Sequence, residues 1–317
     1  NLTPALLGSA TAATPGAGAL IEGAFHHLPG IGPQRAREFM ERGVLTWDDL
    51  ERDSDRLPIG STRREALRRA IETSRRAARE NDLRALVETF ATRDHWRVLG
   101  RFFDRASFFD IETSGNEADA VVTLISCLHR GELHTFLRGE NLDDFLDLLD
   151  DVELLVSFNG NSFDVPRVER GFAIPAVPCT HLDLRWVCYH EGLRGGLKAI
   201  EQQLGVERPD DLAGVDGEEA VWLWQRWERT RDPWARAQLL RYCGADAITL
   251  SLVAATLLRA RGCEVCGLST AAWQALLPAA EAEPPPELAA RKPRALSAEA
   301  DDTKARLMRH LRRTAHR

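Results

Sequence analysis

Between residues 106 and 261 the chain alternates between runs with apolar residues at every second position and runs with apolar residues three and four apart. The first spacing is typical of strands and the second of helices. Three apolar runs follow one another closely at the start of this region, so we expect an antiparallel meander there. The pattern predicts strands at 106–112, 121–129, 132–138, 153–158 and 180–184, and helices at 142–150, 164–171, 196–204, 217–229 and 234–261.

A turn followed by a helix marks the N-terminal part of the chain. Gly30 and Gly32 flank Ile31, and glycines permit a tight turn with positive φ. Pro33 comes next, and proline is favoured as the first residue of a helix. The helix that follows carries an apolar stripe at helical spacing, made of Ala36, Phe39 and Met40.

Four carboxylates and one tyrosine have spacings that suit shared chemistry. Asp110 and Glu112 are two residues apart in a predicted strand, so their side chains would share one face. Tyr242 and Asp246 are four residues apart in a predicted helix, which puts them one turn apart on one side. Asp164 would open a helix directly after a buried strand.

Carboxylate oxygens are the ligands that hard divalent cations prefer. Hydrolysis of a phosphodiester can use two such cations about 4 Å apart, which bracket the attacking and leaving oxygens. The sequence therefore predicts a metal-dependent nuclease that uses two Mg²⁺ or Mn²⁺ ions. Its metal ligands would be Asp110, Glu112, Asp164 and Asp246. The alternative is that these residues form a solvated acidic face.

Three segments that contain these residues resemble the motifs Exo I, Exo II and Exo III of the DEDD exonucleases. The segments are 108–113, 158–164 and 242–246. One subfamily has a histidine five residues before the last aspartate, where this chain has Arg241. The other has a tyrosine four residues before it, as Tyr242 is here, so the chain resembles the tyrosine (DEDDy) subfamily. The resemblance implies an RNase H-like α/β fold with a mixed β-sheet flanked by helices, two-metal chemistry and 3′-to-5′ polarity.

Within that subfamily the chain is similar to the YprB-like exonuclease domain over roughly residues 105 to 260, a group that also resembles the proofreading domain of family B DNA polymerases. The likeness rests on residues 158–160, 163–166, 181–184 and 196–201. It implies that Tyr242 orients the attacking water and that Asp183 lies in an outer shell of the site. Alternatively, Asp183 holds a loop or caps the next segment. Substrate contacts are expected from Thr113, Asn159 and Asn161.

Residues 27–36 resemble a helix-hairpin-helix motif, which implies a small all-α DNA-binding domain. The backbone N–H groups of Gly30, Ile31 and Gly32 would contact a DNA phosphate at a helix N-terminus, with Arg35 beside them. A shorter copy at 57–60, Leu-Pro-Ile-Gly, precedes a second helix that is rich in arginine. The alternatives are a plain helical turn for the first copy and a solvated helix face for these arginines.

The net charge of −7 at pH 7 would oppose binding to nucleic acid if it were evenly spread. It is segregated, because residues 103–262 are acidic whereas the helix after Gly60 and the C-terminal segment are basic. Bound cations would offset the acidity of the core, and the basic flanks would attract phosphates. There is no signal-peptide pattern and no membrane-spanning stretch, so we expect a cytoplasmic protein with no membrane partner.

Six cysteines and a cluster of tryptophans leave alternatives open. Cys263 and Cys266 form half of a zinc-binding pattern, while the other cysteines are expected to be buried thiols in a reducing compartment. The tryptophans have helical spacing, which favours packing in the core, with base stacking as the alternative. They are Trp222, Trp224, Trp227 and Trp234.

These observations divide the chain into a flexible tail (1–22), a helix-hairpin-helix module (23–80), a connector (81–104), an RNase H-like exonuclease domain (105–262) and a C-terminal extension (263–317) with a basic helix at 298–317. The predicted function is hydrolysis of DNA, as single strands or 3′ ends of duplexes, to 5′-mononucleotides during DNA repair. The resemblance to YprB-like domains also implies a helicase as a partner. The alternatives are an RNA-trimming exonuclease and a non-catalytic DNA-binding adaptor.

Overall fold

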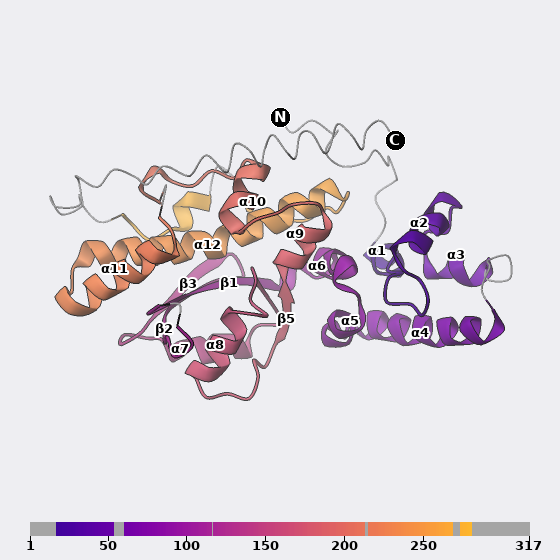
Figure 1. Cartoon of the computed structure of the whole chain (residues 1–317), viewed down its shortest axis with the longest axis horizontal. Coiled ribbons are helices and arrows are strands. Elements are labelled where there is room, and N and C mark those ends of the chain that lie inside the picture. The colour runs from indigo at the N-terminus through magenta and orange to yellow at the C-terminus, as the bar shows by residue number, and fades with distance from the viewer. Residues whose placement is uncertain (1–16, 54–59, 116, 213–214, 269–272, 281–317) are drawn as a thin grey trace.

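A five-stranded mixed sheet lies at the centre of the computed structural model, which describes residues 17–53, 60–115, 117–212, 215–268 and 273–280 (Figure 1). The strand order is β3-β2-β1-β4-β5. The strands β1, β2 and β3 form the predicted antiparallel meander, whereas β4 and β5 extend it in parallel with β1. The strands are β1 (Ala106–Thr113), β2 (Val122–His129), β3 (Glu132–Leu137), β4 (Leu154–Ser157) and β5 (Thr180–Asp183). The mixed sheet and its flanking helices confirm the predicted RNase H-like fold class.

The two faces of the sheet bury different sets of side chains. Phe109 and Ile111 of β1 pack with Phe145 of α7 (Asp144–Asp150) and Val168 of α8 (Asp164–Gly171). Because side chains alternate along a strand, Asp110 and Glu112 point to the opposite face. Figure 1 shows α12 on that side of the sheet, and α12 packs against β1 and β2.

Among the residues that the structure describes, four α-helices follow β5. Three of them match predictions, namely α10 (Leu197–Leu204), α11 (Gly217–Thr230) and α12 (Pro233–Ala260). The first, α9 (Leu184–His190), was not predicted; the carboxylate of Asp183 caps it by accepting from the backbone N–H of Arg185. Asp232 caps α12 in the same way, and Pro233 is its first residue.

Helix α12 is long and apolar enough to cross a membrane by length and composition. Within the structure, 83% of its most apolar window is buried inside the protein. Its apolarity is therefore accounted for by its position against the sheet, where it forms the central helix of the core.

The N-terminal module consists of α1 (Ala17–Glu22), α2 (Pro33–Glu41), α3 (Trp47–Arg52) and α4 (Ser61–Glu80). The prediction of a flexible tail over 1–22 is wrong for its last six residues, because α1 forms there and buries Leu20 and Ile21. Trp47 joins α3 to the segment that follows α1, since its indole N–H donates to the carbonyl of Ala24 over 2.7 Å. The shorter hairpin copy lies largely outside the described residues, apart from Gly60, which is the N-cap of α4.

Residues 81–104 are a folded bridge between the N-terminal module and the sheet rather than a simple linker. They form α5 (Leu83–Thr89), α6 (His95–Arg101) and two short 3-10 helices. Helix α6 packs on α1, and α5 packs on α4 and β5. Arg84 of α5 also donates to the carbonyl of Pro178 over 2.9 Å. The N-terminal module is therefore attached to the sheet through a continuous apolar core.

The start of the C-terminal extension also packs on the central domain. Trp273, in a short 3-10 helix (Trp273–Leu276), is only 1% exposed. Arg241 of α12 donates to the carbonyl of Pro278 over 2.5 Å. The basic helix predicted at 298–317 lies outside the described residues.

Candidate functional site

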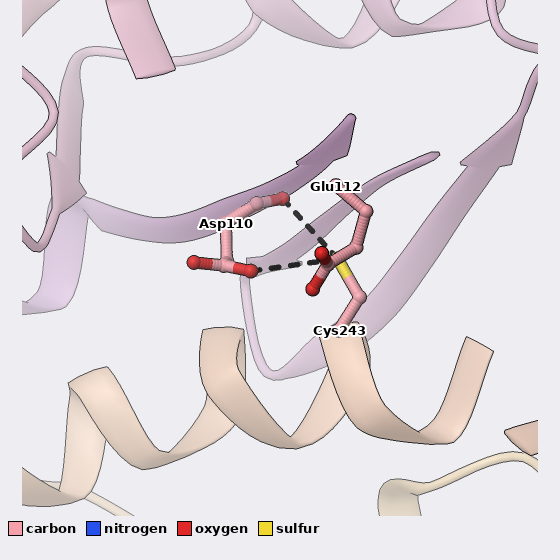
Figure 2. Close-up of side chains that lie close together, drawn as sticks. All are labelled: Asp110, Glu112 and Cys243. Atoms are coloured by element: carbon pink, nitrogen blue, oxygen red, sulfur yellow. Dashed lines mark hydrogen bonds between the residues drawn. The ribbon is translucent and has the colours of Figure 1, made fainter. Parts of the chain in front are cut away.

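Asp110 and Glu112 lie on one face of β1, as their spacing predicted, and this face is turned toward α12 (Figure 2). Cys243 of α12 faces them, and its Sγ lies 3.4 Å from the carbonyl oxygen of Asp110 and 3.7 Å from Oδ2. One potential ligand atom from each of these three residues lies within 4.8 Å of the others. The strand register shifts between Glu112 and Thr113, which is a local irregularity of a kind often found beside active sites.

Asp164 is the first residue of α8 and is 3% exposed. Burial, reinforced by the charge of Asp183, raises the pKa of Asp164 to about 7, although backbone hydrogen bonds oppose this shift. The charge of Asp164 also acts on Asp110 and Glu112. The carboxylate of the second motif thus adds its negative charge to that of the first, although Asp164 is not in the group whose ligand atoms lie within 4.8 Å of one another.

The carboxylates of β1 lie where negative charge is unfavourable. Burial raises the pKa of Asp110 and of Glu112 well above the usual range, and repulsion from Asp246 adds to both shifts. A cation bound among these oxygens would relieve that repulsion. Oxygen donors of this kind fit a hard divalent metal ion such as Mg²⁺ or Mn²⁺. The Cys243 thiol is a poor ligand for such an ion, because burial raises its pKa well above the usual range and keeps it protonated.

Asp246 of α12 has a cationic partner within the protein. Its carboxylate forms an ion pair with Arg208, whose guanidinium also makes two hydrogen bonds of 2.7 Å to the carboxylate of Glu201. Thr249 donates to the same Glu201 side chain over 2.5 Å. Burial alone would lower the pKa of Arg208, but the charges of Asp246 and Glu201 raise it above its ordinary value. Arg208 therefore stays charged and fixes the orientation of Asp246.

Tyr242 lies one helical turn before Asp246 and is 4% exposed. The Nζ of Lys198 donates to its phenol oxygen over 2.8 Å and lies 4.4 Å from the centre of its ring. Burial and the charges of Asp246 and Glu112 raise the pKa of Tyr242 well above its usual range. The phenol therefore keeps its proton, accepts a hydrogen bond from Lys198 and can donate its own O–H into the site.

Asp183 organises the loop that carries the second motif. It is 3% exposed, and its two oxygens accept from the backbone N–H groups of Asn159 at 2.8 Å and Asn161 at 3.3 Å. His181 adds a second tie, because its ring nitrogens lie 2.8 Å from the hydroxyl of Ser157 and 3.0 Å from Oδ1 of Asn161. Of the two alternatives for Asp183, the contacts are those of a residue that holds a loop and caps a helix.

Asn159 and Thr113, two of the residues expected to contact substrate, have side chains that already form hydrogen bonds within the protein. Asn159 has a positive φ of 68°, and its side-chain oxygen accepts from Arg185. A Cβ atom at Gly160 would collide with the hydroxyl of Ser157, so only glycine fits there. Thr113 is 5% exposed, and its hydroxyl donates to the carbonyl of Gly115 over 2.6 Å. The Thr113 side chain therefore stabilises the chain after β1.

The predicted hairpin lies between α1 and α2, in the N-terminal module that Figure 1 shows beside the domain that contains the sheet. Gly30 has a φ of 79°, and Gly32 is the N-cap of α2. Ile31 is 3% exposed and anchors the turn in the core. Arg35 donates to the carbonyl of Gly30 over 2.6 Å, and the side chain of Arg63 from α4 lies against the same glycine. Two arginines from separate helices thus flank the turn.

Sequence reasoning missed three charged residues of the site, namely Lys198, Glu201 and Arg208. Lys198 and Glu201 belong to a segment quoted only for its likeness to related domains, and Arg208 carried no signal. Arg241, which replaces the histidine of the other subfamily, makes hydrogen bonds of 2.8 and 3.1 Å to the carboxylate of Asp211.

Gly244 permits a close approach to Leu133 of β3, because a Cβ there would lie 2.9 Å from a Leu133 methyl carbon.

One comparison with known proteins agrees with the fold. Residues 107–258 match the RNase_H_2 family model, described as the RNase_H superfamily. No curated protein matches the chain. A family B DNA polymerase from the hyperthermophilic archaeon Pyrobaculum calidifontis aligns at 17% identity with a TM-score of 0.37, and the match covers 54% of this chain and 28% of the polymerase chain. The family match agrees with the RNase H-like fold of the segment from β1 to α12, and the carboxylates of that segment fit a metal-dependent nuclease.

Proposed function

We propose that this protein is a 3′-to-5′ exonuclease of the tyrosine DEDD subfamily with a YprB-like domain, and that its substrate is DNA. One observation carries the proposal. Asp110 and Glu112 face α12 together, the buried carboxylates of Asp164 and Asp246 add their charge to that pair, and buried Tyr242 lies one turn before Asp246. The three motifs are far apart in the sequence, so an ordinary acidic surface would not collect them in the interior. Burial also opposes the reading as a solvated acidic face.

Asp110, Glu112, Asp164 and Asp246 would hold two divalent cations. Bound there, such ions lower the pKa of water and stabilise a leaving oxyanion. The phenol O–H of Tyr242 would position the attacking water, and Lys198 would fix the phenol. Arg208 and Glu201 would hold Asp246 in the orientation in which it faces the other carboxylates. Attack at phosphorus breaks the bond to the 3′ oxygen and releases a 5′-mononucleotide. The 3′-to-5′ polarity follows from the family resemblance.

The N-terminal module supports DNA as the substrate. Gly30 and Gly32 are exposed in the turn that precedes α2, and Arg35 and Arg63 lie beside Gly30. The arginines exposed along α4 would contact phosphates of a duplex without reading its sequence. They are Arg63, Arg68, Arg69, Arg76 and Arg79. Helix-hairpin-helix binding of duplex DNA next to a 3′ exonuclease would suit DNA repair, and a helicase would be a natural partner because it supplies free ends.

A degradation assay with end-labelled substrates tests this function. Single-stranded DNA, duplexes with recessed or overhanging 3′ ends and RNA are each incubated with Mg²⁺, Mn²⁺ or a chelator. A 3′ label should appear at once as a mononucleotide, while a 5′ label should give a ladder that shortens with time. Asp110→Asn serves as the inactive control. Faster degradation of RNA would replace DNA with RNA as the substrate, and activity that survives the chelator would contradict the metal site.

A further inference from the structure

Two exposed aromatic side chains touch each other on helix α9. Among the residues that the structure describes, the large apolar side chains with high exposure are Met40, Leu45, Val121, Trp186 and Tyr189. Only Trp186 and Tyr189 are aromatic; they are 38% and 46% exposed. They lie three residues apart on one face of the helix, with ring centres 5.8 Å apart and ring planes at 71°.

The tryptophans noted in the sequence do not offer such a surface. Trp224 is 4% exposed, and the other three are partly buried against the same core. Base stacking, if it occurs outside the site, is therefore more readily provided by α9 than by α11 or the start of α12.

The exposed aromatic pair has positively charged neighbours at both ends. The guanidinium carbon of Arg185 lies 5.9 Å from the ring centre of Trp186, and that of Arg194 lies 3.9 Å from the ring centre of Tyr189. The nearby carboxylate of Glu191 is engaged by Arg261 at 2.6 Å. Aromatic faces next to arginines are the features by which proteins hold single-stranded nucleic acid.

Both ends of this surface connect to the carboxylate site. Helix α9 begins directly after Asp183, and Arg185 donates to the side chain of Asn159 in the second motif. At the other end, the chain leads from α9 into α10 (Figure 1). Lys198 of α10 donates a hydrogen bond to Tyr242. The helix that carries the aromatic pair is thus tied to the loop of the second motif at one end and leads to the helix that holds Tyr242 at the other.

We propose that Trp186 and Tyr189 form a stacking platform for the single strand that leads to the cleaved end, with Arg185 and Arg194 contacting its phosphates. The inference rests on the proposed nuclease function and deepens it. Bases within a duplex already stack on each other and their faces are covered, whereas unpaired bases can stack on a side chain. The platform therefore selects substrates with unpaired nucleotides before the 3′ terminus.

Binding without catalysis tests the platform directly. Fluorescence anisotropy in the presence of a chelator measures the affinity of the full chain for oligothymidylate and oligouridylate of roughly ten nucleotides, a length within the range of single-strand binding sites. Trp186→Ala and Tyr189→Ala should each weaken binding by about tenfold, the scale of losing one base–aromatic stack. The matched controls Trp186→Phe and Tyr189→Phe keep an aromatic face and should stay within about threefold of wild type. Unchanged affinity in both alanine variants would overturn the platform.

A second arm separates failure of the platform from failure of the proposed function. The p-nitrophenyl ester of thymidine 5′-monophosphate has no nucleotides before the cleaved bond that could stack on the platform. The alanine variants should therefore hydrolyse it at the wild-type rate while their KM for oligonucleotides rises. If wild type degrades oligonucleotides and the variants match it, the platform is wrong and the nuclease stands. If wild type hydrolyses neither substrate with any divalent metal ion, the proposed function itself is wrong.

Photocrosslinking can show which nucleotides of a bound oligonucleotide lie on the platform. An oligonucleotide with 5-iodouracil at one position is irradiated with the protein, and the modified peptide is sequenced. Interior positions should crosslink to the peptide that contains Trp186 and Tyr189, whereas the 3′-terminal position should not. Crosslinks from interior positions only to other peptides would overturn the platform, and would leave a protein partner as the occupant of the exposed pair.

Discussion

Lys198 and Tyr242 form a hydrogen bond that joins α10 to α12, with 2.8 Å between the Lys198 Nζ and the phenol oxygen. Because the ammonium group only donates, the tyrosine must accept. Its single O–H is then free to point elsewhere, and the raised pKa of Tyr242 keeps that hydrogen in place. The tyrosine would therefore act by holding the attacking water in position, and Lys198 would act by holding the tyrosine.

This pair can be tested by a double-mutant cycle. Tyr242→Phe should lower kcat by about 10- to 1,000-fold, the range for losing one positioning or proton-handling group. Lys198→Met should lower kcat by a smaller factor and leave metal affinity, measured by calorimetry, unchanged. The double variant should be no slower than Tyr242→Phe alone, since the lysine acts through the phenol. Multiplicative losses would show that Lys198 contributes independently of Tyr242.

Replacing two of the carboxylates by asparagine should have opposite effects on the stability of the metal-free protein. Asp110 lies among like charges, so Asp110→Asn should raise the melting temperature at pH 8. Asp246 is ion-paired with buried Arg208, so Asp246→Asn should lower the free energy of unfolding by about 1–3 kcal/mol. Both variants should be inactive. Thermal unfolding in a chelator measures the difference, and a higher melting temperature for Asp246→Asn would contradict the role given to Arg208.

The pKa of Asp164 predicts a pH dependence. Its folded-state pKa is raised from 3.8 to about 7, so folding is favoured when the group is protonated. That contribution is complete below about pH 4 and is lost as the pH rises through 7. Without metal, wild type and Asp164→Asn should therefore be similarly stable near pH 4. The variant should become the more stable protein by pH 8, by up to about 4 kcal/mol.

Unfolding by denaturant at each pH measures this difference. Added Mg²⁺ or Mn²⁺ should stabilise wild type at pH 8 more than it stabilises Asp164→Asn, because the variant lacks one ligand. A stability difference that does not change between pH 4 and pH 8 would show that Asp164 ionises normally in the folded protein.

The arginines of α4 should determine how strongly salt weakens binding to duplex DNA. Removing the whole module would uncover the apolar surfaces of α5 and α6, so charge substitutions are the cleaner change. Arg68→Gln, Arg69→Gln and Arg76→Gln should each flatten the slope of log affinity against log salt by up to about 0.9. Arg229→Gln, an exposed arginine on α11, is the control for a change of charge alone. Equal slopes for the α4 variants and this control would rule out α4 as a duplex clamp.

Local spacing determined much of this protein. Alternation along β1 placed Asp110 and Glu112 on one face, and the interval of four placed Tyr242 and Asp246 on one side of α12, because each relationship lies within a single element of fixed geometry. Runs of apolar residues predicted the five strands and most helices of the domain. Helix α9 escaped because it is short and begins without a break after β5, so its strand-like start concealed it.

Tertiary structure alone decided which side chains meet across elements. Arg208 and Asp246 are separated by 38 residues, and Lys198 and Tyr242 by 44, so no local period relates them. Tertiary structure also decided which tryptophans contact water. Trp186 is exposed, whereas the tryptophans of α11 pack against the core, and nothing in the local sequence distinguishes them. A side chain's partner and its contact with water depend on how helices pack on the sheet, and that packing minimises the free energy of the whole chain rather than of any one segment.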